Sequence, residues 1–213
     1  MSKKRTVWIP ALIAAVIAAL LAGYYFYNSW SNGGGMHPGE GGGPPGGMKG
    51  HPPGGEQGYG ELFKTFGTLS VFLGAAGFCW YWFKKKLKSP SLIVRKIGRL
   101  LHALHKPLGW AALLLIAAHG IYFLVTKLQD HKIYSGLAAF VILLALAGYG
   151  FFINKIRNRW MRLVHRSLAL LWVPALLLHA GGSAITAVLI TLGIGVLIWI
   201  LEKWASRNVQ PAA

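Results

Sequence analysis

Acidic residues are scarce in this sequence. The 213 residues include only five of them, Glu40, Glu56, Glu61, Asp130 and Glu202, and none lies deep inside an apolar run. A hydrolase of the paired-carboxylate type needs two carboxylates close together. A carboxylate proton relay across a membrane needs them within the spanning helices. The distribution therefore excludes both classes.

Cysteine occurs once, as Cys79. A single thiol cannot form a disulfide within the chain, a cysteine-based zinc site or an iron–sulfur cluster. The H-E-x-x-H motif of zinc proteases is also absent from the sequence. We interpret Cys79 as a small apolar helix residue.

Charged residues make up 13% of the chain, whereas 54% is hydrophobic. The sequence contains several uncharged runs, and their lengths are close to the roughly 20 residues that a spanning helix needs. The first, after three basic residues, resembles a signal peptide, but it is too long, so we interpret residues 1–30 as an uncleaved transmembrane helix. The sequence predicts an all-α membrane protein with six transmembrane helices, the other five covering about residues 62–83, 100–126, 134–153, 163–180 and 184–201.

The formal net charge is +17, but the basic residues form short blocks between the apolar runs. A nucleic-acid-binding surface needs a continuous basic face, so we expect no nucleic-acid partner. Basic blocks between spans are typical of cytoplasmic loops. The pattern predicts a multi-pass protein of the cytoplasmic membrane, surrounded by lipid, with both termini in the cytoplasm and a cytoplasmic tail at residues 202–213.

Residues 31–60 differ from the rest because nearly half of them are glycine, with several prolines. Such a segment cannot bury a core, and we expect a disordered outer loop. It contains Met36, His37, Met48 and His51. Thioether and imidazole groups suit copper and other metals. The segment is therefore either a metal-binding loop or a flexible linker that happens to hold these residues.

Four histidines form the main pattern. His105 and His119 lie fourteen residues apart in the third span, and His165 and His179 lie fourteen apart in the fifth. At about 100° per residue this spacing places both members on one helix face, and the rise separates them by about 21 Å. The two spans run in the same direction, because one span lies between them. The topology therefore pairs His105 with His165 near the inside and His119 with His179 near the outside.

Haem is the cofactor that fits two such pairs. Two neutral imidazoles can ligate one iron axially while apolar helices enclose the porphyrin. Zinc usually needs three or four protein ligands at one level, whereas each level here offers about two. We therefore expect two stacked haem b groups inside a bundle of spans two to five, within a haem-binding region at residues 61–201. With both axial positions filled, the irons are suited to electron transfer.

Further polar residues lie near the inner pair. His102 precedes His105 by one turn and is rotated about 100° off the shared face, so it either bonds a haem propionate or lies at the membrane interface. Four basic residues are placed to offset propionates at this level, or they are ordinary cytoplasmic charge; they are Arg99, Lys106, Arg162 and Arg166.

At these positions the sequence resembles the ferric reductase-like transmembrane family. The family carries histidine pairs at similar spacing on its third and fifth spans, and the stretch R-W-M-R-L-V-H at residues 159–165 is similar to its approach to the fifth-span histidine. The resemblance implies two b haems on the four histidines. Family members often continue into a flavin and NADPH domain, which this sequence lacks after its last span. We therefore expect a cytoplasmic flavoprotein or a quinol as electron donor.

Three functions stay open on sequence alone. The first is an oxidoreductase component that carries electrons through the two haems to ferric or cupric ions or to an extracytoplasmic redox partner. The second is a haem-bearing anchor subunit of a larger respiratory complex, which would copurify with a catalytic subunit. The third is metal binding or transport led by the outer loop, which would be abolished by deleting residues 33–58 and retained without the spanning histidines.

Overall fold

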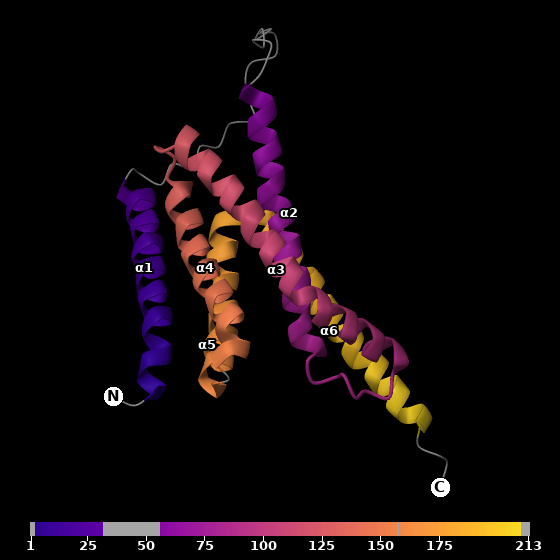
Figure 1. The fold of residues 1–213 in the computed structure, drawn as a ribbon. Coiled ribbons are helices and arrows are strands. Elements are labelled where there is room, and N and C mark those ends of the chain that lie inside the picture. Colours follow the sequence, from indigo (N-terminus) through magenta and orange to yellow (C-terminus); the bar gives the residue numbers. More distant parts are fainter. Residues whose placement is uncertain (1–2, 32–55, 157, 210–213) are drawn as a thin grey trace, which may run out of the picture.

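The computed structural model describes residues 3–31, 56–156 and 158–209, and within them it contains six helices and no strands (Figure 1). Every helix is long and apolar enough to cross a membrane. The predicted all-α multi-pass membrane fold is confirmed. The helices are α1 (Lys3–Ser31), α2 (Glu56–Phe83), α3 (Leu92–Thr126), α4 (Lys132–Ile156), α5 (Arg159–Ala180) and α6 (Gly182–Val209).

Several helices are longer than predicted. Helix α2 begins at Glu56, inside the segment predicted to be a loop, and α3 begins at Leu92 and extends over 35 residues. Helix α6 continues to Val209, so most of the predicted tail is helical. About 20 residues cross the hydrocarbon core. The additional turns carry polar residues beyond it, where hydropathy no longer marks the helix.

Side-chain caps explain how two of the helices begin. Ser91 precedes α3, and its hydroxyl oxygen accepts a hydrogen bond from the amide of Val94. Asn158 does the same for α5, accepting from Trp160 at 3.0 Å. Both caps satisfy first-turn amides that lack an acceptor within the helix. Gly181, whose φ of 53° favours glycine, caps the end of α5, and α6 follows directly.

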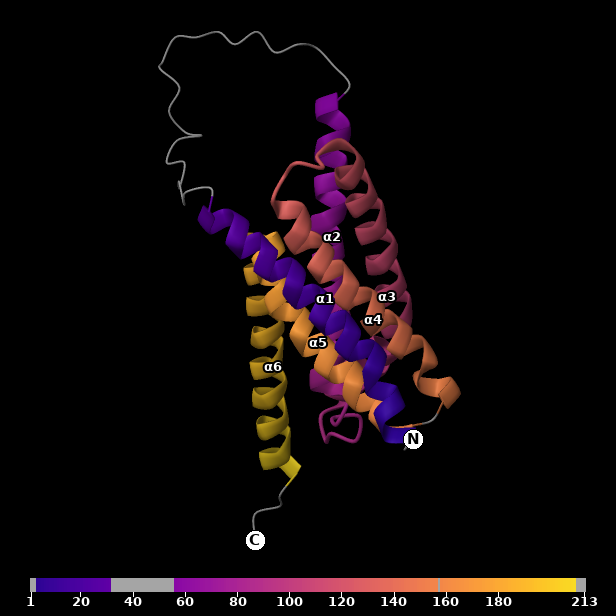
Figure 2. The ribbon, with the colours of Figure 1, turned by 90° about the vertical axis from the view of Figure 1, so that its left-hand side faces the viewer.

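The helices pack mainly as neighbours in sequence: α2 lies against α3, and α4 lies against α5. Helix α1 covers α4 and α5, while α6 packs against α2 (Figures 1 and 2). The central cluster is formed by buried side chains of α4 and α5, including Ile142, Leu168 and Trp172, with alanines of α1 and α6 against it. A smaller cluster joins Phe83, Val94 and Ile198 of α2, α3 and α6.

The α2–α3 and α4–α5 connections lie at the end of the bundle where α1 begins and α6 ends (Figure 1). We call this the basic end. The only carboxylate there among the described residues is Glu202, which accepts a hydrogen bond from Lys86. The cations of this end are Lys84, Lys85, Lys86, Lys88, Arg95, Lys96, Arg99, Lys106, Lys155, Arg159, Arg162, Arg166, Lys203 and Arg207.

An interhelical hydrogen bond joins α1 to α4 near the basic end. The buried Tyr149 of α4 donates its hydroxyl to the carbonyl of Val7. Interhelical hydrogen bonds in membrane proteins contribute about 0.6 kcal/mol on average. We expect Tyr149→Phe to lower unfolding stability in detergent by about that amount, measured by denaturant titration. An unchanged midpoint would show that packing alone holds α1.

Candidate functional site

The structure brings the four spanning histidines together in two pairs. His105 of α3 faces His165 of α5, with ring centroids 6.3 Å apart and ring planes at 81°. His119 faces His179 at 6.2 Å and 79°. The two levels therefore have almost the same geometry. Fourteen residues of helix separate them on both helices, which corresponds to about 21 Å.

Three of the histidines direct Nδ1 to a backbone carbonyl of the neighbouring helix. His105 and His119 bond α2, at Gly77 O (3.0 Å) and Phe63 O (2.7 Å). His165 bonds α4 at Leu146 O (3.0 Å). A carbonyl oxygen can only accept, so Nδ1 of each ring carries the proton. In the neutral imidazole Nε2 then keeps its lone pair for another partner.

The fourth histidine reaches the same tautomer through a hydroxyl. Nδ1 of His179 lies 3.2 Å from Oγ of Ser135 on α4. The hydroxyl of Ser135 already donates to the carbonyl of Lys132, at 2.9 Å. Its oxygen is therefore the acceptor towards His179, which donates from Nδ1. All four imidazoles are oriented alike, with Nε2 as the free acceptor.

Glycines of α2 and α4 let the imidazoles approach the helix backbone. A β-carbon added at Gly67 would lie 2.7 Å from the His119 ring, and one at Gly136 would lie 2.7 Å from the His179 ring. At Gly150 the corresponding distance to His165 is 3.0 Å. Carbon atoms normally approach to about 3.5–4.0 Å. These three positions exclude any side chain while the rings stay in place.

The spacing of each pair fits a metal ion between two axial imidazoles. A metal–imidazole bond is about 2.0–2.1 Å, and the ring centre lies about 1.1 Å beyond the nitrogen, so centroids are expected about 6.3 Å apart. Histidine ligands typically donate their other ring N–H to a protein acceptor, as here. In the part of the chain that the structure describes, no three His, Cys, Asp or Glu side chains gather at one point. The pairs therefore fit a metal whose equatorial ligands come from a macrocycle such as haem.

Three cations gather near the His105–His165 level. Lys84, at the end of α2, lies close enough to Arg162 and Arg166 of α5 to experience their charges. Burial lowers the pKa of Lys84 below its usual range, and these like charges lower it further. The cluster therefore favours an anion, such as a macrocycle carboxylate. Arg99 and Lys106 are exposed on α3.

The remaining candidates lie apart from the pairs. The ring of His102 packs against Trp80, with centroids 4.7 Å apart, and does not face a second histidine. This placement agrees with its rotation away from the shared face. Met36, His37, Met48 and His51 lie outside the described residues.

Sequence reasoning missed Lys84, Ser135 and Gly136 as site residues. A signal was available for Gly136, because Gly136 and Gly150 are separated by the same fourteen residues as the histidines of α5. Lys84 is the first cation after the aromatic end of its span. The hydroxyl of Ser135 is not distinguishable in the sequence from other helix serines.

Ser135 provides a test of the histidine orientation. We expect Ser135→Ala to weaken haem retention at the His119–His179 level roughly tenfold, because lost partners of metal-ligating histidines typically cost 10–100-fold. Haem loss to an apo-globin acceptor measures this. Ser183→Ala is the matched control, since the Ser183 hydroxyl at the start of α6 donates to the backbone carbonyl of Ala180 at the end of α5. Equal loss rates in both variants would contradict the assignment.

Comparison with protein-family models, with curated proteins and with solved structures finds no match for this chain.

Proposed function

We propose that this protein transfers electrons across a membrane through two haem b groups, one held by each histidine pair. The observation that carries the proposal is the repeated geometry of the two pairs, with centroids 6.3 and 6.2 Å apart and every Nδ1 directed to a protein acceptor. Bis-imidazole haem supplies one-electron transfer without an open coordination position.

The side chains have distinct roles in this proposal. The four imidazoles would hold the haem irons through Nε2. The acceptors on α2 and α4 fix the ring orientation and raise the basicity of Nε2. Gly67, Gly136 and Gly150 allow the rings to lie against the helices. Lys84, Arg162 and Arg166 offset propionate charge at one level.

Orientation follows from charge. Cytoplasmic loops of membrane proteins carry an excess of Lys and Arg, so the basic end lies in the cytoplasm. A flavoprotein or a quinol is the donor on that side. A ferric or cupric ion, or a redox protein, is the acceptor at the level of His119 and His179.

Reconstituted protein tests the proposal. Purified full-length protein is expected to contain two b haems per chain by haem extraction. Liposomes that hold it and enclose ferricyanide should reduce the ferricyanide when dithionite is added outside, whereas protein-free liposomes should not. A purified, folded protein without b haem would overturn the proposal. Haem-loaded protein without transfer would limit it to an anchoring role.

A further inference from the structure

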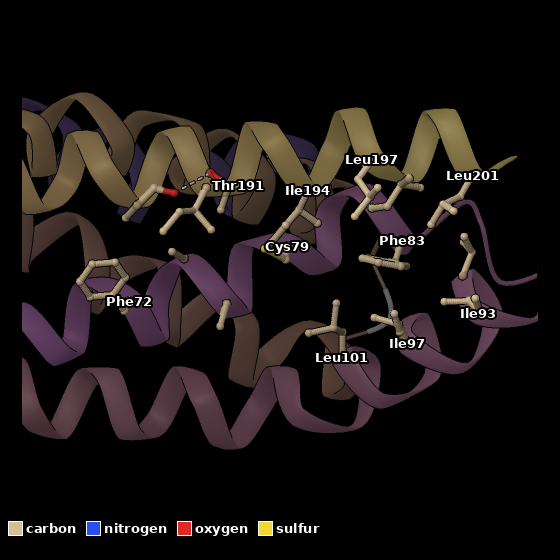
Figure 3. A pocket seen from close by; sticks show the side chains of 16 residues that line it. Phe72, Cys79, Phe83, Ile93, Ile97, Leu101, Thr191, Ile194, Leu197 and Leu201 are labelled. Carbon is tan, nitrogen blue, oxygen red and sulfur yellow. Dashed lines mark hydrogen bonds between the residues drawn. The ribbon is translucent and has the colours of Figure 1, made fainter. Parts of the chain in front are cut away.

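A long cavity lies away from the histidines, between α2, α3 and α6 (Figure 3). Its volume is about 370 Å³, and its lining is almost entirely apolar. The hydroxyl of Thr191, which also lines it, already donates to carbonyls of its own helix. The cavity therefore has little to offer a polar ligand and suits a hydrocarbon chain.

The cavity runs along the helices rather than across them. Figure 3 shows Phe72 near one end, Cys79 in the middle, and Ile93 with Leu201 at the other end. On α6 the lining extends from Ala187 to Leu201, fourteen residues, or about 21 Å of helix. One leaflet of a bilayer that is about 40–45 Å thick with its headgroups has a similar depth. The cavity thus spans one leaflet.

The end marked by Ile93 and Leu201 lies at the basic end and has features that suit an anion. Ser91 O and Oγ accept from the amides of Arg95 and Val94, and the earlier amides of Leu92 and Ile93 have no acceptor within the helix. Such a helix start attracts phosphate groups. Arg95 and Lys96 add two charges within the same turn.

One cationic side chain at this end has a nitrogen without a partner in the described part of the protein. Nε of Arg95 is buried and has no hydrogen-bond partner there. Glu202, which follows the cavity-lining Leu201, accepts a hydrogen bond from Lys86 and not from Nε of Arg95. An anion from outside the protein could accept a hydrogen bond from Arg95 and balance its charge at this end of the cavity.

We propose that the α2–α3–α6 cavity binds one anionic phospholipid, with an acyl chain between Phe72 and Leu201 and the phosphate at the start of α3. The one-leaflet length, the apolar lining and the cationic mouth together match a chain joined to a phosphate. A quinol would match the lining, but its neutral head would leave the positive charge of Arg95 without a counter-charge. This site does not depend on the proposed electron transfer.

Lipid binding can be measured without reference to haem. Purified protein is placed in nanodiscs of phosphatidylcholine with 10 mol% phosphatidylglycerol, transferred to detergent, and examined by native mass spectrometry. We expect one retained phosphatidylglycerol. Retention should fall about fivefold for each removed cation in Arg95→Gln and Lys96→Gln. Lys155→Gln, an exposed cation of α4 at the same end, is the control and should retain lipid like the wild type.

Cys79 reports on the occupied cavity, because it lines the middle of it and is the only cysteine. A small apolar thiol reagent should label it more slowly in nanodiscs with phosphatidylglycerol than in pure phosphatidylcholine. Arg95→Gln should remove this difference. Ala76→Phe, which fills the cavity, should abolish retention. Equal retention in all variants, labelling that ignores phosphatidylglycerol, or a quinone as the retained molecule would each overturn the proposal.

Discussion

His119→Ala is expected to reduce bound haem from two per chain to one, and His179→Ala is expected to give the same product. Each change removes one of the two histidines at a single level. The His105–His165 pair stays intact, because the helix rise places it about 21 Å from the changed level. Haem extraction and reduced-minus-oxidised spectra measure the outcome. His105→Ala and His165→Ala should also give protein with one haem, which keeps the spectrum of the haem at the His119–His179 level.

His102→Ala is the matched control for these variants. His102 lies on the same helix as His105, but its ring packs against Trp80. It should therefore keep two haems and both spectral signals. If His102→Ala loses a haem while His105→Ala keeps two, the assignment of ligands at this level is wrong. Loss of both haems in every variant would indicate general misfolding, which thermal unfolding of each variant would reveal.

Gly136→Ala is expected to impair the His119–His179 level about as strongly as a lost ligand. The new methyl group would lie 2.7 Å from the His179 ring, well inside van der Waals contact. The ring is also bonded to Ser135, so it cannot move away without losing that acceptor. We expect at least tenfold weaker haem retention at this level, because misdirected ligands of this kind cost 10–100-fold. Haem transfer to apo-globin gives the rate.

Gly148→Ala on the same helix is the control, because nothing lies within 4 Å of a β-carbon there. Alanine is a better helix residue than glycine by about 1 kcal/mol, so this variant should be as stable as the wild type or more so. Equal haem retention in Gly136→Ala and Gly148→Ala would show that the His179 ring has freedom that the structure does not suggest.

The six-helix architecture was predictable because hydrocarbon imposes a strict rule on composition. Spans must be apolar and charges must lie outside them, so uncharged runs and basic blocks locate helices and turns. The helix ends were not predictable in the same way. Residues such as Glu56, Leu92 and Val209 lie where water can satisfy the backbone, and there the capping groups and tertiary contacts decide the boundary.

The pairing of the histidines was also within reach of sequence, because spacing fixes the helix face and the number of spans fixes the direction. The second layer of the site was not. Phe63, Gly77 and Leu146 contribute backbone carbonyls, which every residue type possesses. Which carbonyl meets which ring depends on the rotation and height of α2 and α4 against α3 and α5. That information arises only when the helices pack.

The packing of α2 on α3 and of α4 on α5 divides the bundle into two helical hairpins, each connected at the basic end. Each histidine is anchored within its own hairpin, yet its partner belongs to the other one. On the proposed function, the prosthetic groups therefore cross-link two preassembled halves. A chain cut in the α3–α4 turn, between Thr126 and Lys132, would still carry complete half-sites. Its two fragments would then associate more tightly when haem is supplied. Haem binding would therefore favour completely assembled protein during biogenesis.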